Sequence, residues 1–244
     1  MIDGIINLFK KKKEGGKTLP KNYIKKKLIS KKGAKEIDIL LPGWGERFVE
    51  YEPLKKRILK KGHSCLEYTF HPNILTSDYK QTLKCFKEIK KSVRLEIKEL
   101  SKKYKKINLY GTSLGCVNAC RIANNNPLIN KIVLIVPGHC LAESVWTGIK
   151  TQEMRKEFEK KGVTLKQLKK YWERLAPINN IDGLQNKKID MYLSQADELI
   201  RHEGGTALIT GMKKEGLKPK VFENKFLGHY LTILKFYYFP KDIT

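Results

Sequence analysis

INLYGTSLG, residues 107–115, is the stretch that decides the fold of this 244-residue chain. Its first four residues form a mostly apolar run typical of a strand, and the last five read Gly-x-Ser-x-Gly. This motif holds a serine on a sharp turn where a strand gives way to a helix, with the hydroxyl pointing outward. Small residues two before and two after the serine avoid collisions between the strand end and the helix start. The stretch therefore predicts Ser113 as an exposed nucleophile.

Strand-like and helix-like segments alternate on both sides of this turn. The apolar runs that predict strands cover residues 37–41, 64–70, 107–110, 132–136, 189–193 and 220–223, and residues 23–29 add an edge strand. Patterns with helical spacing cover residues 46–61, 79–104, 114–124, 204–215 and a last segment from about Tyr230. In the first of these, Pro53 lies near the first turns or marks the true start of the helix. Alternation of this kind demands a mostly parallel sheet with helices on both faces, which defines the α/β class.

A serine hydroxyl needs a base to take its proton, and the base needs a third group to orient it. Asp197 follows the predicted strand 189–193, and His229 lies in a late loop before the last helix. The chain order Ser113, Asp197, His229 is typical of folds in which the serine stands on this kind of turn. Glu198 and Glu203 are the alternative acids. Three of the other histidines lie at a strand start, in a turn and in an exposed-looking segment, namely His63, His71 and His202. His139 follows the predicted strand 132–136 and is a candidate substrate contact instead.

With these residues the chain resembles the α/β-hydrolases over residues 37–244. The resemblance implies that LPGWG, residues 41–45, is the oxyanion loop, with the backbone N–H groups of Trp44 and Leu114 binding the oxyanion. The loop has Pro42-Gly43 where the family often has His-Gly, and it lacks the run of three glycines found in lipases. His139 and Trp146 are expected to contact substrate in the pocket. Trp44 is also expected near its mouth.

The same resemblance sets the expected domains. Residues 34–138 and 187–244 form the hydrolase core. Residues 139–186, where the alternation breaks, form a small helical cap inserted after the sixth strand in the family's order. Residues 1–33 are a lysine-rich N-terminal arm, for which a packing arm or frayed terminus is the preferred interpretation. Ile2, Ile5, Ile6 and Phe9 could alternatively share one face of a short helix over residues 2–9. That helix leaves a peripheral contact with an anionic membrane open.

The formal net charge of +25 comes from 50 Lys and Arg against 25 Asp and Glu. The lysines decorate nearly every helical segment, and no nucleic-acid motif accompanies them, so nucleic acid is not the expected partner. The charge would still favour acidic or phosphorylated substrates. No run approaches the roughly 18 apolar residues of a membrane span, and the opening residues lack the charge order of a secretory signal. We expect a cytoplasmic protein.

Five cysteines, an odd number without a Cys-x-x-Cys pair, argue against a disulfide framework. Cys116 and Cys120 lie one helical turn apart and are expected to pack as small apolar groups. Their spacing with His139 or Cys140 matches no zinc pattern, so neither a metal nor an organic cofactor is expected.

The prediction is a serine hydrolase that cleaves an ester of a small-molecule acyl substrate, in the manner of a carboxylesterase or monoacylglycerol lipase. A thioesterase and an aminopeptidase-like amidase remain open, because one fold serves many reactions. A non-catalytic protein that binds nucleic acid or an anionic membrane is the alternative of another class. The sequence leaves the acyl length and the oligomeric state open.

Overall fold

The computed structural model describes residues 19–239, and the short helix expected over residues 2–9 lies outside them. Its strands are β1 (Ile24–Ile29), β2 (Glu36–Leu41), β3 (Ser64–Phe70), β4 (Lys106–Thr112), β5 (Lys131–Ile135), β6 (Lys188–Ser194) and β7 (Lys220–Asn224). Its α-helices are α2 (Glu52–Lys60), α3 (Tyr79–Leu100), α4 (Leu114–Ala123), α5 (Leu141–Thr147), α6 (Gln152–Lys160), α7 (Leu165–Tyr171), α8 (His202–Lys214) and α9 (His229–Tyr238). The 3₁₀ helices are η1 (Phe48–Tyr51), η2 (Pro72–Ile74), η3 (Ile149–Thr151), η4 (Glu173–Leu175) and η5 (Pro177–Asn180).

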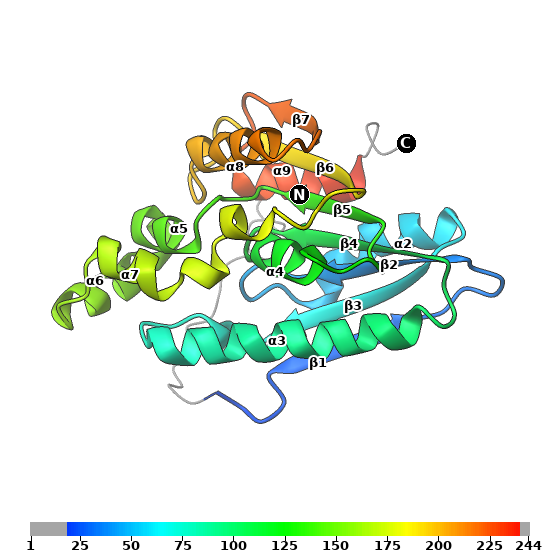
Figure 1. Cartoon of the computed structure of the whole chain (residues 1–244), viewed down its shortest axis with the longest axis horizontal. Coiled ribbons are helices and arrows are strands. Elements are labelled where there is room, and N and C mark those ends of the chain that lie inside the picture. Colours follow the sequence, from blue (N-terminus) through cyan, green and yellow to red (C-terminus); the bar gives the residue numbers. More distant parts are fainter. Residues whose placement is uncertain (1–18, 240–244) are drawn as a thin grey trace.

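The strands form one sheet in the order β1-β3-β2-β4-β5-β6-β7 (Figure 1). Only β1 is antiparallel, with Ile24 opposite Phe70 of β3, and every other neighbouring pair is parallel. The predicted mostly parallel sheet and the edge strand are both confirmed. Because parallel strands end at the same side of a sheet, the turns after β2, β4, β5 and β6 meet at one edge.

Helices cover both faces of the sheet. Alternate residues of β2 show how: Ile39 and Leu41 pack into the core beneath α3, α4 and α8, whereas Leu40 packs into the core beneath α2 and α9. The central strands are buried on both faces, as their continuous apolar runs predict. Side chains of the two cores therefore fix the positions of the strand ends.

Two predicted helices are shorter than their patterns indicated. The helix expected from Glu46 begins only at Glu52, because Pro53 fits the first turn of α2 and residues 48–51 form η1 instead. Glu46 consequently lies in a loop. The long helix expected to reach Tyr104 ends at Leu100, since the chain turns there to enter β4.

The stretch between β5 and β6 carries α5, α6, α7 and three 3₁₀ helices, which is the region where the sequence lost its alternation. The strand counted sixth in the family's order is β5 of the described chain. Figure 1 shows α5, α6 and α7 extending beyond one end of the sheet. Trp172, which follows α7, is buried and packs edge-to-face on Phe158 of α6, with 5.7 Å between the ring centroids.

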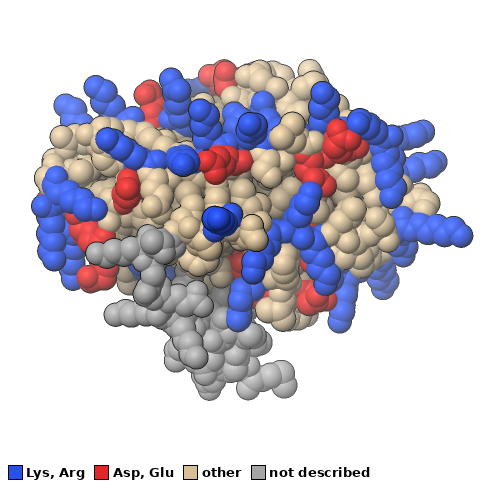
Figure 2. All heavy atoms as spheres, turned by 90° about the horizontal axis from the view of Figure 1, so that it is seen from below, with Lys and Arg blue, Asp and Glu red and all other residues tan. Residues whose placement is uncertain are grey.

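Lysine and arginine side chains stand out over the face of the molecule shown in Figure 2, with Asp and Glu side chains among them. This mixture agrees with lysines distributed over many helical surfaces. Within residues 19–239, no helix combines the length and the apolar character needed to cross a membrane.

Candidate active site

Ser113 stands between β4 and α4 in a backbone conformation that few non-glycine residues adopt, with φ 51° and ψ −114°. Its N–H donates to the carbonyl of Ile135 at 2.8 Å, which fixes the turn against β5. A Cβ added at Gly111 would lie 2.7 Å from the Gly115 carbonyl oxygen, and one added at Gly115 would lie 2.2 Å from that of Leu41. The close approach of β2, β4 and α4 therefore requires glycine at both positions. Backbone strain of this kind clusters at functional sites.

His229 and Asp197 form a buried pair. The Nδ1 atom of His229, the first residue of α9, lies 2.7 Å from Asp197 Oδ2, and both side chains are 3% exposed. Asp197 Oδ1 accepts the backbone N–H groups of Leu199 at 2.9 Å and Ile200 at 2.7 Å. These bonds fix the carboxylate, which in turn fixes the imidazole with Nδ1–H as the donor. The Nε2 atom is left to accept a proton.

Glu198, the first alternative acid, has a different role. Its Oε2 accepts the backbone N–H of His229 at 3.0 Å, and a Cβ added at Gly228 would lie 2.7 Å from the same atom. Glu198 thus holds the start of α9 rather than the imidazole. Glu203 lies in the first turn of α8 and is exposed.

Ser113 and His229 line the same cavity, which has a volume of about 1230 Å³. Among the described residues no hydrogen bond joins the Ser113 hydroxyl to His229. The structure therefore joins Asp197 and His229 directly, and it places Ser113 and His229 on the wall of one cavity. Hydrogen bonds of catalytic groups are often long without substrate and tighten when it binds.

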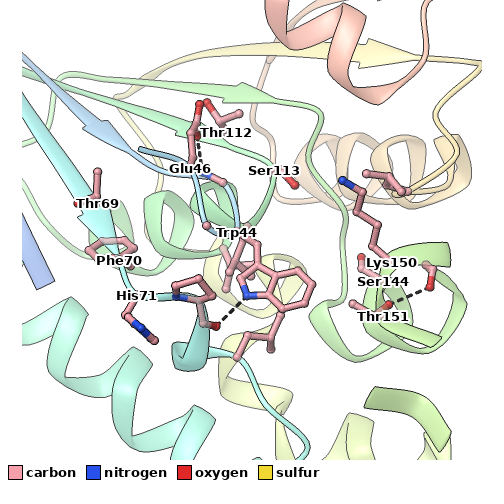
Figure 3. Close-up of a pocket in the computed structure, with 18 of the residues that line it drawn as sticks. Trp44, Glu46, Thr69, Phe70, His71, Thr112, Ser113, Ser144, Lys150 and Thr151 are labelled. Carbon is pink, nitrogen blue, oxygen red and sulfur yellow. Dashed lines mark hydrogen bonds between the residues drawn. The ribbon is translucent and has the colours of Figure 1, made fainter. Parts of the chain in front are cut away.

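The loop after β2 lies beside Ser113, as expected for an oxyanion loop. A Cβ added at Gly43 would lie 3.6 Å from Ser113 Cβ, so this backbone passes close to the serine. The Trp44 indole Nε1 donates to the Pro72 carbonyl at 2.8 Å, which ties the loop to η2 (Figure 3). Leu114 opens α4, where the first N–H groups of a helix have no partner within it. Both predicted donor residues line the cavity.

The cavity walls are largely apolar. Its apolar side chains come from both halves of the chain and include Phe70, Leu75, Val117, Leu141, Val145 and Ile233. Two predicted pocket residues lie elsewhere. His139 Nε2 lies 3.0 Å from Glu143 Oε2, and the Trp146 ring packs under the Arg155 guanidinium at 5.4 Å, so neither side chain lines the cavity.

Glu46 is a residue whose position the sequence pattern did not reveal. Its buried carboxylate accepts the Gly43 N–H at 2.6 Å through Oε2, and the Tyr237 hydroxyl at 2.7 Å through Oε1. The Tyr51 hydroxyl lies 3.2 Å from Oε2, and Tyr237 also bonds Thr112 at 2.8 Å. One carboxylate thus links the loop after β2, the residue before Ser113 and the far end of α9. The only signal in the sequence was an acid three residues after Gly43.

Burial raises the pKa of Glu46 to about 7, although its three hydrogen-bond donors lower it in part. The folded state therefore holds this proton more tightly than the unfolded chain, where the pKa is near 4.5. The contribution of protonated Glu46 to the free energy of unfolding is fully present below pH 4.5 and is lost as the pH rises through 7. Glu46→Gln mimics the neutral acid, so wild-type stability should fall relative to this variant between pH 4.5 and 8.

Between these pH values, the difference in free energy of unfolding between wild type and Glu46→Gln should change by up to about 3 kcal/mol, at about 1.4 kcal/mol per pKa unit. Urea unfolding at pH 5 and pH 8 measures it, with Glu203→Gln as the exposed control that shows no such change. A difference between wild type and Glu46→Gln that is equal at the two pH values would contradict this account.

The thiols take no part in the site. Cys116 Sγ, just past the serine turn, donates to the carbonyls of Gly111 at 3.1 Å and Ile135 at 3.3 Å. Burial raises the pKa of the Cys120 thiol to about 12. Residues 19–239 contain no group of three or more His, Cys, Asp or Glu side chains placed to hold a metal ion.

Comparison with solved structures finds many of the same fold. The esterase Pf2001 of Pyrococcus furiosus superposes with a TM-score of 0.60 at 18% identity, covering 87% of this chain and 84% of that one. A monoacylglycerol lipase of Paleococcus ferrophilus superposes with a TM-score of 0.57 at 16% identity, covering 84% of this chain and 90% of the lipase. Esterase 2 of Thermogutta terrifontis, phosphonylated by sarin, superposes with a TM-score of 0.59 at 15% identity, covering 84% of this chain and 80% of the esterase. No family model and no curated protein matches the sequence.

The strand order, the covering helices and these neighbours show that the chain has the α/β-hydrolase fold. The family resemblance of the sequence is thereby confirmed at the level of the fold.

Proposed function

We propose that the protein is a serine hydrolase that cleaves carboxylic esters of small molecules, with Ser113 as nucleophile, His229 as base and Asp197 as the acid that orients it. The observation that carries the proposal is the buried 2.7 Å bond between His229 Nδ1 and Asp197 Oδ2, on the wall of the cavity that Ser113 also lines. The strained turn at Ser113 and the esterases and lipase among the structural neighbours support it.

In the proposed reaction, Ser113 Oγ attacks the ester carbonyl while His229 Nε2 takes its proton. The backbone N–H groups of Trp44 and Leu114 stabilise the negative oxygen, a contribution typically worth about 10²–10³ in turnover per donor. His229 then gives the proton to the leaving alcohol. Water attacks the acyl-serine by the same route and releases the acid. Thioesters and amides are further substrates that this chemistry admits, and esters are favoured by the neighbours.

The remaining assignments belong to the same proposal. Residues 139–186 act as a cap: α5 and η3 supply Leu141, Ser144, Val145 and Thr151 to the cavity. Residues 34–138 and 187–244 are assigned to the core, and residues 1–33, which include β1, are assigned to the N-terminal arm. Five unpaired thiols support a reducing, cytoplasmic location.

A fluorophosphonate probe tests the assignment, because it reacts covalently only with an activated hydroxyl. We expect one equivalent to label the native protein, with peptide mapping placing it on Ser113. Esterase 2 of Thermogutta terrifontis, which has a similar fold, is phosphonylated by sarin, and this supports the choice of probe. Heat-denatured protein is the control and should stay unlabelled. Absence of labelling in folded protein, or labelling at another residue, would refute the proposal.

A further inference from the structure

Lys150 lines the candidate cavity and is itself an exposed residue. It belongs to η3, which follows α5 after Gly148, and it lines the same cavity as Ser113 and His229. Figure 3 shows its side chain extending from η3 toward Ser113, so that the ammonium and the serine hydroxyl point toward one another across the cavity. The cap therefore places a positive charge on the side of the cavity where the proposed chemistry occurs.

No carboxylate neutralises this charge at close range. The contacts of Lys150 are the Tyr230 hydroxyl and the Tyr230 ring, whose centroid lies 4.3 Å from Nζ. Among the described residues no carboxylate oxygen lies within 4.0 Å of it. Glu198 raises its pKa from a distance, and burial lowers the pKa by more. Glu198 Oε2 accepts the His229 N–H, and Lys150 is exposed with no carboxylate of residues 19–239 at close range.

The other charged residues of the cavity leave it electropositive. Lys25 of β1 and Arg47 line it as well, and Arg47 is paired with Glu50 at 3.4 Å. Glu46, the remaining acid of the lining, is buried and occupied by the Gly43 N–H and the Tyr237 hydroxyl. Lys150 is thus the cation best placed to meet a bound anion beside Ser113.

We propose that Lys150 binds an anionic group of the substrate, so that the enzyme prefers esters carrying a carboxylate or phosphate near the bond that is cleaved. The inference rests on the proposed function and names the substrate class of the same site. A lysine binds either anion as a point charge, whereas the apolar walls hold the hydrocarbon part. This charge pairing discriminates between an anionic ester and a neutral one of similar shape.

Two matched pairs of esters test the proposal and locate the anion. Mono-4-nitrophenyl glutarate against 4-nitrophenyl valerate places a carboxylate on the acyl side. Butyrylglycerol 3-phosphate against monobutyrin places a phosphate on the alcohol side. The measured quantity is the ratio of kcat/KM between the anionic and neutral members. We expect a ratio of about ten or more for one pair in the wild type, which decreases with added salt.

Lys150→Gln should lower that ratio about tenfold, and Lys150→Arg should preserve most of it. Lys166→Gln, an exposed lysine of α7, is the matched control and should leave the ratio unchanged. A wild-type ratio at or below one for both pairs, or a ratio that Lys150→Gln does not change, would overturn the proposal. These outcomes leave fluorophosphonate labelling of Ser113 intact. Loss of labelling together with no hydrolysis of any of the four esters would instead overturn the proposed function and this inference with it.

Discussion

Ser113→Ala is expected to lower kcat for 4-nitrophenyl butyrate by about 10⁵–10⁶-fold, because the variant has no atom that can form the acyl-enzyme. The methyl group fits the turn as well as the serine side chain does, so far-UV circular dichroism and the urea midpoint should change little. The remaining turnover should reflect substrate binding and the oxyanion loop alone.

Ser144→Ala is the matched control. Ser144 also lines the cavity, but its hydroxyl donates to the Cys140 carbonyl at 3.2 Å and is tied to α5. We expect this variant to keep activity within about threefold. Wild-type turnover in Ser113→Ala, or an equal loss in Ser144→Ala, would show that another group is the nucleophile.

Asp197→Asn should lower kcat by about 10⁴-fold while the fold stays intact. The amide oxygen must take the place of Oδ1, since the N–H groups of Leu199 and Ile200 point at that position. The amide N–H₂ then faces His229 Nδ1, which must become an acceptor. The proton moves to Nε2, so the imidazole can no longer remove one from Ser113.

Glu198→Gln tests whether Glu198 only holds the start of α9 or also orients the His229 imidazole. Within residues 19–239 this carboxylate accepts one hydrogen bond, from the backbone N–H of His229, and a glutamine oxygen can accept the same bond. We expect a loss below about tenfold in kcat. A larger loss in Glu198→Gln than in Asp197→Asn would reverse the roles given to the two acids.

The sheet and the order of its elements could be predicted from the sequence because the signals are local. The run 132–136 is apolar enough to predict a strand covered on both faces, and β5 is buried as expected. The serine turn was predictable for the same reason: Gly111 and Gly115 lie within one short stretch, and both are required by the close approach of the backbone there. The pairing of Asp197 with His229 was predictable only as an order along the chain.

Interactions between distant segments could not be predicted. Glu46 fits a helical pattern, and only the packing of α9 against the loop after β2 shows that Tyr237 reaches its carboxylate. Lys150 is one lysine among many, and its place in the cavity depends on how η3 follows α5. His139 was expected in the pocket because it follows a central strand, yet its partner Glu143 lies one helical turn further on.

The position of His229 at the start of α9 has a consequence for protein synthesis. Chains fold from the N-terminal side as they leave the ribosome, at about 5–20 residues per second. A nascent chain that has emerged only through β6 carries the serine on an unfinished sheet and lacks the imidazole. Under the proposed function, the Ser113 hydroxyl has no base to activate it until α9 has been synthesised and has docked, so we expect a chain that ends after β6 to remain unlabelled by a fluorophosphonate.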